Sequence, residues 1–411
     1  MRASLRSLAP TGGLGGFPRS IYLLGVSNFV LSAGRSAAWL FLPILLYTGY
    51  GLSFFEIGVL IALMIPVSMV SSLVGGAGSD RYGRRPFVAL PPLLNSATGF
   101  LIYGFWNHGL LLLMGLLALN SLFINLGNPS QNAVIADVVA SPRRLDAFSL
   151  FRIFSNAGFA LSPALGGFLA SAFGLPVVFL VSSVTNLVGG ILLILLFPET
   201  KVPGGAQEPT TFAKGMSFPF HDASLLAFGV LGFGLTLAVQ QFGTALALFT
   251  SSVRGLSYDQ IGWLYSVNGL LVVLLQLPIA RQITLRKRYL RWMATGSILY
   301  GLSFLIFYAA PIYLVFVIGM GILTIGEDIV SPLQNVVVAA MASSEKRGSY
   351  FGAYSTLTSS ARVIAPPLGT LLLSTGSSLA LWGTMALVTL VVAAGYLFLH
   401  QRLGHRFLSD S

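Results

Sequence analysis

The 411-residue sequence contains no cysteine, and only 9% of its residues are charged, whereas 55% are hydrophobic. Soluble globular domains carry about a quarter charged residues, so this composition excludes an ordinary soluble protein. Disorder is excluded because it requires low hydrophobicity together with high net charge. The lack of cysteine excludes a disulfide scaffold, thiolate metal sites and thiol catalysis. The composition therefore indicates a polytopic helical membrane protein.

Twelve segments are apolar enough to cross a bilayer as helices, each of which needs about 20 residues. They are residues 21–47, 57–74, 87–106, 110–138, 148–173, 177–197, 225–250, 261–279, 289–308, 312–341, 351–373 and 379–400. The predicted fold class is therefore all-α, with twelve transmembrane helices.

The formal net charge of +11 would suggest nucleic-acid binding in a soluble protein, but the positions of the charges argue against it. With the N-terminus inside, 19 of the 23 Lys and Arg residues fall on the inner side, one falls in the outer loops, and three lie inside spans. Cytoplasmic loops attract Lys and Arg. This distribution predicts a multi-pass protein of the cell (plasma) membrane with both termini cytoplasmic.

The two halves of the chain repeat each other. Residues 51–60 match residues 255–264 at six of ten positions, and further matches between 129–166 and 332–369 follow at a constant offset. A polar, Pro- and Gly-containing stretch separates the halves. The predicted domains are residues 1–200 and 223–411, each a six-helix bundle related by a pseudo-twofold axis, with a cytoplasmic linker at 201–222. Transporters with this duplication bind their substrate between the bundles.

Residues 76–85, between the second and third spans, read GAGSDRYGRR. This segment resembles the cytoplasmic G-x-x-x-D-R-x-G-R-R signature of the major facilitator superfamily, and the twelve-span, two-repeat plan extends the resemblance over the whole chain. The resemblance implies a cytoplasmic gate in which Asp80 holds the bundles together and Arg84 pairs with Asp137. The alternative is that Arg81 and its basic neighbours only fix the orientation of the chain in the membrane, since cytoplasmic loops attract Arg. The predicted gate residues are Gly76, Asp80, Arg81, Gly83, Arg84 and Asp137.

Residues 158–167 in the fifth span read GFALSPALGG and resemble the antiporter signature of the same superfamily, with Ser where Gly is usual. Small residues and a proline permit close helix packing and a bend. We expect interdomain packing by Gly158, Ser162, Pro163, Gly166 and Gly167. The resemblance implies drug or metabolite efflux.

Four charged side chains fall near the middle of predicted spans, where each costs at least about 2.5–3.5 kcal/mol and is by default a functional candidate. Glu327 and Arg362 are nearly equidistant from the turn between their spans, so we expect an ion pair between Arg362 and one acid, with Glu327 favoured. Asp328 would then face the central cavity and could carry a proton. The alternative is an ion pair that only orders the bundle. Arg35 would bind an anionic substrate group or pair with Asp328.

Several uncharged polar residues fall on spans that line the cavity in this superfamily, although such residues more often form interhelical hydrogen bonds. The candidates are Asn28, Asn125, Gln240 and Gln241. The four histidines show no metal-ligand spacing, and the sequence has no nucleophile or phosphate-binding motif, so we expect neither an enzyme nor a metal or cofactor.

The predicted function is secondary active transport of a small organic solute by alternating access, as a proton-coupled exporter of drugs or metabolites. The alternative is proton-coupled uptake of an anionic metabolite, motivated by Arg35 and Arg362. The expected partners are a small-molecule substrate, protons and the lipid bilayer, with no nucleic acid, and we expect a monomer.

Overall fold

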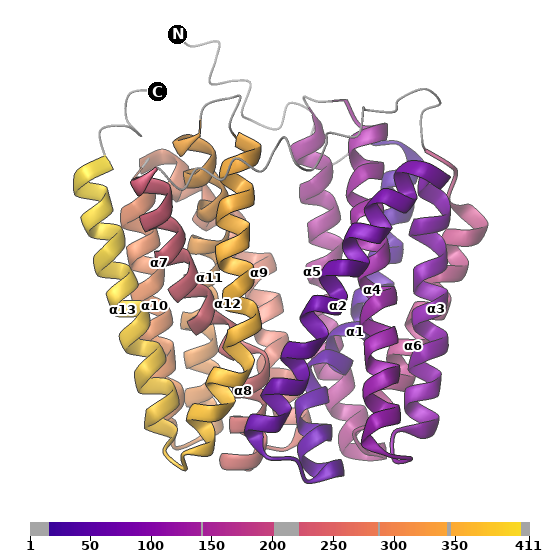
Figure 1. Ribbon diagram of the computed structural model, residues 1–411, viewed down its shortest axis with the longest axis horizontal. Coiled ribbons are helices and arrows are strands. Elements are labelled where there is room, and N and C mark those ends of the chain that lie inside the picture. The colour runs from indigo at the N-terminus through magenta and orange to yellow at the C-terminus, as the bar shows by residue number, and fades with distance from the viewer. Residues whose placement is uncertain (1–15, 141–142, 201–221, 287, 343–346, 404–411) are drawn as a thin grey trace. The chain divides into compact units, whose positions relative to one another are not determined.

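The computed structural model describes residues 16–140, 143–200, 222–286, 288–342 and 347–403, and within these ranges it contains helices and no β-strand. The first half forms six helices, α1 (Arg19–Tyr50), α2 (Phe54–Tyr82), α3 (Arg84–Phe105), α4 (Leu110–Val138), α5 (Arg144–Phe173) and α6 (Val177–Leu196) (Figure 1). The second half forms α7 (Ala223–Val239), η2 (Gln240–Phe242), α8 (Thr244–Leu248), η3 (Phe249–Val253), α9 (Tyr258–Arg286), α10 (Tyr289–Ala309), α11 (Tyr313–Met341), α12 (Arg347–Ser374) and α13 (Ser378–Leu403).

Among the described residues, eleven helical segments are long and apolar enough to cross a membrane. The segment from α7 to η3 counts as one of them, Ala223–Val253. The helix outside this set is α12, which is 28 residues long but carries many Ser and Thr residues as well as Arg362. With α12 the chain has the twelve long helical segments of the predicted all-α class.

The chain divides into two compact units. The first contains residues 1–42 and 64–206, and the second contains residues 43–63 and 207–411. The end of α1 and the start of α2 therefore belong to the second unit, where Gly58 of α2 lies directly against Thr370 and the Pro366 carbonyl of α12. The simpler division into residues 1–200, 201–222 and 223–411 stays a prediction.

In the first unit, α3 lies beside α4 and α6 (Figure 1). A core of apolar side chains joins the helices from within, with contributions from α1, α3, α4 and α6 that include Leu24, Val88, Val134 and Leu193. Each of these side chains is almost completely buried. The apolar core accounts for the packing of the helices within this unit.

In the second unit, α10 lies beside α11 and α13, and α7 lies beside α12 and α13 (Figure 1). The buried Trp382 is at the centre of an aromatic cluster, with ring centroids 5.3 Å from Phe249, 5.7 Å from Phe304 and 5.7 Å from Phe307. Aromatic side chains bury large areas and favour such offset or edge-to-face contacts. This cluster fixes the packing of η3, α10 and α13.

The seventh predicted span, 225–250, is not one continuous helix. It is interrupted by the 3₁₀ turn η2 and ends in the π-helical turn η3. Local departures from α-helical geometry of this kind are often found at functional positions. The interruption begins at the polar pair Gln240 and Gln241, which the hydropathy of the whole segment averages out.

The start of α2 and the start of α9 show the internal repeat at atomic detail. Ser53 N donates to Glu56 Oε2 at 2.8 Å and Glu56 N donates to Ser53 Oγ at 3.3 Å, which is a capping box. At the matching position Ser257 N donates to Gln260 Oε1 at 3.1 Å. The glycine two residues before each serine has a positive φ, 65° and 64° respectively. The duplicated sequence therefore produces the same turn and the same helix start twice.

Candidate functional site

The connection between α2 and α3 holds the charged motif of residues 76–85. Gly83 connects the two helices with a φ of 105°, which glycine adopts without strain. Arg84 Nε donates to Asp137 Oδ2 on α4 at 2.9 Å, and Arg84 Nη1 donates to Ser79 Oγ at 2.9 Å and to the Asp80 carboxylate. The Arg84–Asp137 ion pair that the motif implies is therefore present, and it joins the ends of α2, α3 and α4.

The two carboxylates of this network differ in accessibility. The Asp80 side chain is 69% exposed, whereas that of Asp137 is 25% exposed and that of Arg84 is 13% exposed. Arg81 is exposed and its guanidinium lies 5.3 Å from the centroid of the Tyr82 ring. The role of Asp80 in holding the bundles together stays a prediction.

Glu199 is a member of this network that sequence reasoning missed. It follows α6, and its carboxylate accepts hydrogen bonds from Arg84 N at 2.9 Å and Arg85 N at 3.1 Å. A carboxylate at a helix N-terminus satisfies unpaired N–H groups and complements the helix dipole. Because α3 begins without a capping side chain of its own, Glu199, which follows α6, takes that place.

Two adjacent glycines of α2, Gly75 and Gly76, differ in how closely they approach α4. A Cβ on Gly76 would lie 3.7 Å from Pro129 Cβ, an ordinary contact. A Cβ on Gly75 would instead collide with the backbone carbonyl of Leu126. Gly75, outside the recognised motif, is therefore the residue that lets these helices pack closely.

The small-residue motif of α5 packs against α1 within the first unit. A Cβ on Gly158 would meet the Phe29 carbonyl and lie 2.9 Å from Ser32 Cβ. Gly166 faces Ala37 in the same way, and Ser162 Oγ accepts a hydrogen bond from Ala37 N at 2.9 Å. Pro163 and Gly167, the remaining motif residues, are buried. The additional role of this motif in interdomain packing stays a prediction.

A second cluster lies at the middle of α11 in the second unit. Glu327 is the central residue of this helix, 14 residues from each end, which corresponds to about 21 Å. Its Oε2 accepts a hydrogen bond at 3.1 Å from Asn268 Nδ2 of α9, and Asn268 Nδ2 also donates to Thr324 Oγ1 at 2.9 Å. Asn268 is 3% exposed and Glu327 is half-buried. Asn268 is not among the residues predicted from the sequence.

Arg362 on α12 is exposed, and its expected ion pair with Glu327 stays a prediction. Equal depth along two neighbouring helices does not by itself fix the direction in which each side chain points. Asp328 is only 2% exposed, and the expectation that it faces the central cavity stays a prediction. Both acids lie within electrostatic range of Tyr300 on α10.

The first unit contains a cavity of about 360 Å³ near the middle of α1. Arg35, Ser36 and Trp39 of α1 line it together with residues of α2, α4 and α5, among them Asn120, Asn125 and Phe159. Arg35 forms no hydrogen bond or ion pair with another described residue. A guanidinium beside aromatic and amide groups can bind an anionic or aromatic group of a ligand.

Of the polar residues expected to line a cavity, Asn125 does so, and its Nδ2 donates to Ser121 O at 2.8 Å. Asn28 is buried and bonds to Ser155 Oγ. Gln241 is completely buried and its Nε2 donates to Ala365 O of α12 at 3.0 Å, whereas Gln240 is exposed. Asn28 and Gln241 therefore join helices to one another.

Comparison with known proteins relates the whole chain to transporters. The sequence profile described as Major Facilitator Superfamily matches residues 24–281 and again residues 224–409. The chain is 26% identical over 396 residues to an uncharacterized MFS-type transporter, YttB, of Bacillus subtilis, with 94% of this chain and 96% of YttB covered. It is 25% identical over 378 residues to a Na(+), Li(+), K(+)/H(+) antiporter of Planococcus maritimus, covering 85% and 88% of the two chains. It is 23% identical over 394 residues to the multidrug resistance protein MdtH of Salmonella newport, covering 94% and 96%.

Solved structures show the same fold. A POT family transporter in complex with 5-aminolevulinic acid superposes with a TM-score of 0.77 at 16% identity, covering 97% of this chain and 99% of that chain. Peptide transporter POT in complex with sulfate superposes with a TM-score of 0.75 at 18% identity, covering 99% of both chains. These relatives are transporters and not enzymes. The duplicated apolar helices, the charged motif between α2 and α3 and the profile match together identify this chain as a multi-pass membrane transporter that belongs to the major facilitator superfamily.

Proposed function

We propose that this transporter exports a small organic solute in exchange for protons, by alternating access. The observation that carries the proposal is the half-buried Glu327 carboxylate at the centre of α11, held by Asn268. A carboxylate at the middle of a membrane-spanning helix is costly and is retained where it serves a function. Proton binding and release at Glu327 would couple the pH gradient to transport.

Asn268 connects the protonation state of Glu327 to helix packing. An amide N–H donates a stronger hydrogen bond to an ionised carboxylate than to a neutral carboxyl group. Protonation of Glu327 would therefore weaken the contact between α9 and α11. A proton that loosens one helix–helix contact biases the equilibrium between conformations, which is what a coupled transporter requires.

The solute class follows from the cavity in the first unit. Its volume of about 360 Å³ suits a small organic molecule, and Trp39 and Phe159 provide aromatic surface for stacking. The names of two relatives, a multidrug resistance protein and a cation/proton antiporter, support export by proton exchange. The charge distribution supports a plasma-membrane protein with cytoplasmic termini, and we propose that it functions as a monomer.

Proteoliposomes with an acidic interior test the exchange, with ethidium as the probe and DNA trapped inside to report its entry by fluorescence. Protons leaving the vesicle should drive ethidium inward in the wild type. Glu327→Gln should lose the acceleration by the pH gradient but retain ethidium counterflow between compartments of equal pH. The matched control is Glu56→Gln, because glutamine also serves in a capping box, as Gln260 does in the second half. Gradient-driven ethidium entry by Glu327→Gln at the wild-type rate would contradict the proposal.

A second candidate is proton-coupled uptake of an anionic metabolite, and Arg35 is the observation that favours it. Its guanidinium lines the cavity and forms no ion pair with a described residue. Vesicles with an acidic exterior and radiolabelled succinate test this candidate. The uptake proposal predicts that protons moving inward drive succinate entry, and that this entry is lost in Arg35→Gln but retained in Arg402→Gln. That result would favour uptake over export as the function of this transporter.

A further inference from the structure

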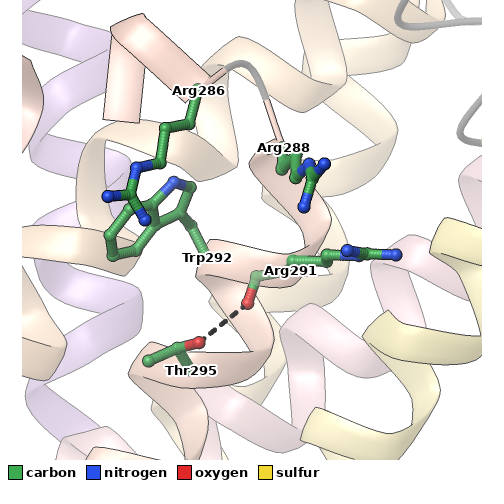
Figure 2. A pocket seen from close by; sticks show the side chains of 5 residues that line it. All are labelled: Arg286, Arg288, Arg291, Trp292 and Thr295. Carbon is green, nitrogen blue, oxygen red and sulfur yellow. Dashed lines mark hydrogen bonds between the residues drawn. The ribbon is translucent and has the colours of Figure 1, made fainter. Parts of the chain in front are cut away.

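A basic cavity lies where α9 ends and α10 begins, in the second unit. Its volume is about 550 Å³, and it is lined by Arg286, Arg288, Arg291, Trp292 and Thr295 (Figure 2). Arg286 ends α9, Arg288 directly precedes α10, and the other three residues lie in the first two turns of α10 (Figure 2). The residues of this cavity take no part in the transport mechanism proposed above.

The three arginines make this cavity strongly cationic. None of them forms an ion pair with a described residue. The N-terminus of α10 adds to the positive potential, because no side chain among the described residues caps it. Thr295 Oγ1 donates to Arg291 O at 3.1 Å, so the hydroxyl proton is already used (Figure 2). The charged donors that face a ligand are therefore guanidinium groups, which favour phosphate.

An exposed apolar stripe continues from this cavity along α10. Ile298, Leu302 and Leu305 have exposed fractions of 45%, 45% and 42%. They follow Arg291 and Thr295 at intervals of three and four residues, so all five share one face of the helix. The face thus changes from cationic to apolar along a membrane-spanning helix. The cationic end complements an anionic lipid headgroup, and the apolar stripe complements its acyl chain.

We propose that this cavity binds the phosphate of an anionic glycerophospholipid, with an acyl chain lying along Ile298, Leu302 and Leu305. Basic pockets at the ends of membrane-spanning helices suit anionic headgroups, and each arginine near an anionic membrane contributes about fivefold in affinity. The amphipathic Trp292 ring, half-buried in the cavity wall, would lie at the level of the headgroup. The apolar stripe favours a lipid over a soluble phosphate, which needs no acyl surface.

Fluorescence quenching tests the site on the full-length protein in detergent micelles. Brominated phosphatidylglycerol and brominated phosphatidylcholine are titrated separately, and the contribution of Trp292 among the five tryptophans is isolated by subtracting the signal of Trp292→Phe. Quenching of Trp292 should be saturable with phosphatidylglycerol and much weaker with phosphatidylcholine. Arg288→Gln and Arg291→Gln should each weaken phosphatidylglycerol binding about fivefold.

The matched control is Arg281→Gln, an exposed arginine on α9 that is not part of the cavity lining. It should leave the quenching unchanged. Equal quenching by the two lipids, or an equal loss in Arg281→Gln and Arg291→Gln, would overturn the proposal. Displacement of phosphatidylglycerol by millimolar inorganic phosphate would also overturn it, because the site would then bind a soluble anion. Native mass spectrometry of the same variants gives an independent count of bound lipid, which should fall in Arg291→Gln and not in Arg281→Gln.

Discussion

The Arg84 network offers a test in which one cation has two carboxylate partners of different exposure. Arg84 is 13% exposed, Asp137 is 25% exposed and Asp80 is 69% exposed. Breaking a buried ion pair costs about 3–5 kcal/mol, whereas an exposed pair contributes about 0–1 kcal/mol. The partly buried Arg84–Asp137 pair should therefore show a coupling energy of about 2 kcal/mol, and the Arg84–Asp80 pair one of about 0.5 kcal/mol.

Two double-mutant cycles measure these couplings. Arg84→Gln is combined with Asp137→Asn in one cycle and with Asp80→Asn in the other, and the free energy of unfolding is obtained by titrating micelles with sodium dodecyl sulfate. Raising the salt concentration should reduce the Asp80 coupling more than the Asp137 coupling, since exposed charges are screened more. Equal couplings, or a larger coupling with Asp80, would refute the reasoning from burial.

Two further predictions concern contacts that hold the first unit together. Gly158→Val should destabilise the protein by about 1–3 kcal/mol in the same titration, because the side chain would meet the Phe29 carbonyl. The control is Gly115→Ala, which should be neutral or stabilising because nothing lies within 4 Å of that position. A neutral Gly158→Val would contradict the packing of α5 on α1. Glu199→Gln should cost about 1 kcal/mol, because a neutral amide is a weaker acceptor for Arg84 N, and an unchanged unfolding midpoint would remove Glu199 from the network.

The sequence predicted the architecture well because each of its signals depends on a local rule. Apolar length predicts a span, and matched spacing reveals duplication. The same locality explains why the capping turn at Ser53 recurs at Ser257 with nearly the same φ at the preceding glycine. The interruption of the seventh span by η2 and η3 could not be foreseen, because it depends on contacts between helices.

The sequence predicted which residues belong to the candidate site better than it predicted which residues they contact. Glu327 and Arg35 could be singled out because charge inside a membrane is rare. The hydrogen bond from Asn268 to Glu327 could not be predicted, because Asn268 is an ordinary amide on a different helix. The pairing with Arg362 stays a prediction, because depth along a helix is readable from sequence and side-chain direction is not. Glu199 was missed because its hydrogen-bond donors are backbone N–H groups, which every sequence contains.

Proton release on substrate binding tests the central role of Glu327 most directly. Ethidium is added to purified protein in weakly buffered detergent solution near pH 7, and the change in pH is followed with an indicator dye. The wild type should release protons, Glu327→Gln should release none, and Asp328→Asn should behave as the wild type because that carboxyl is buried in the second unit. Undiminished proton release from Glu327→Gln, or its loss in Asp328→Asn alone, would contradict the assignment of Glu327 as the proton carrier.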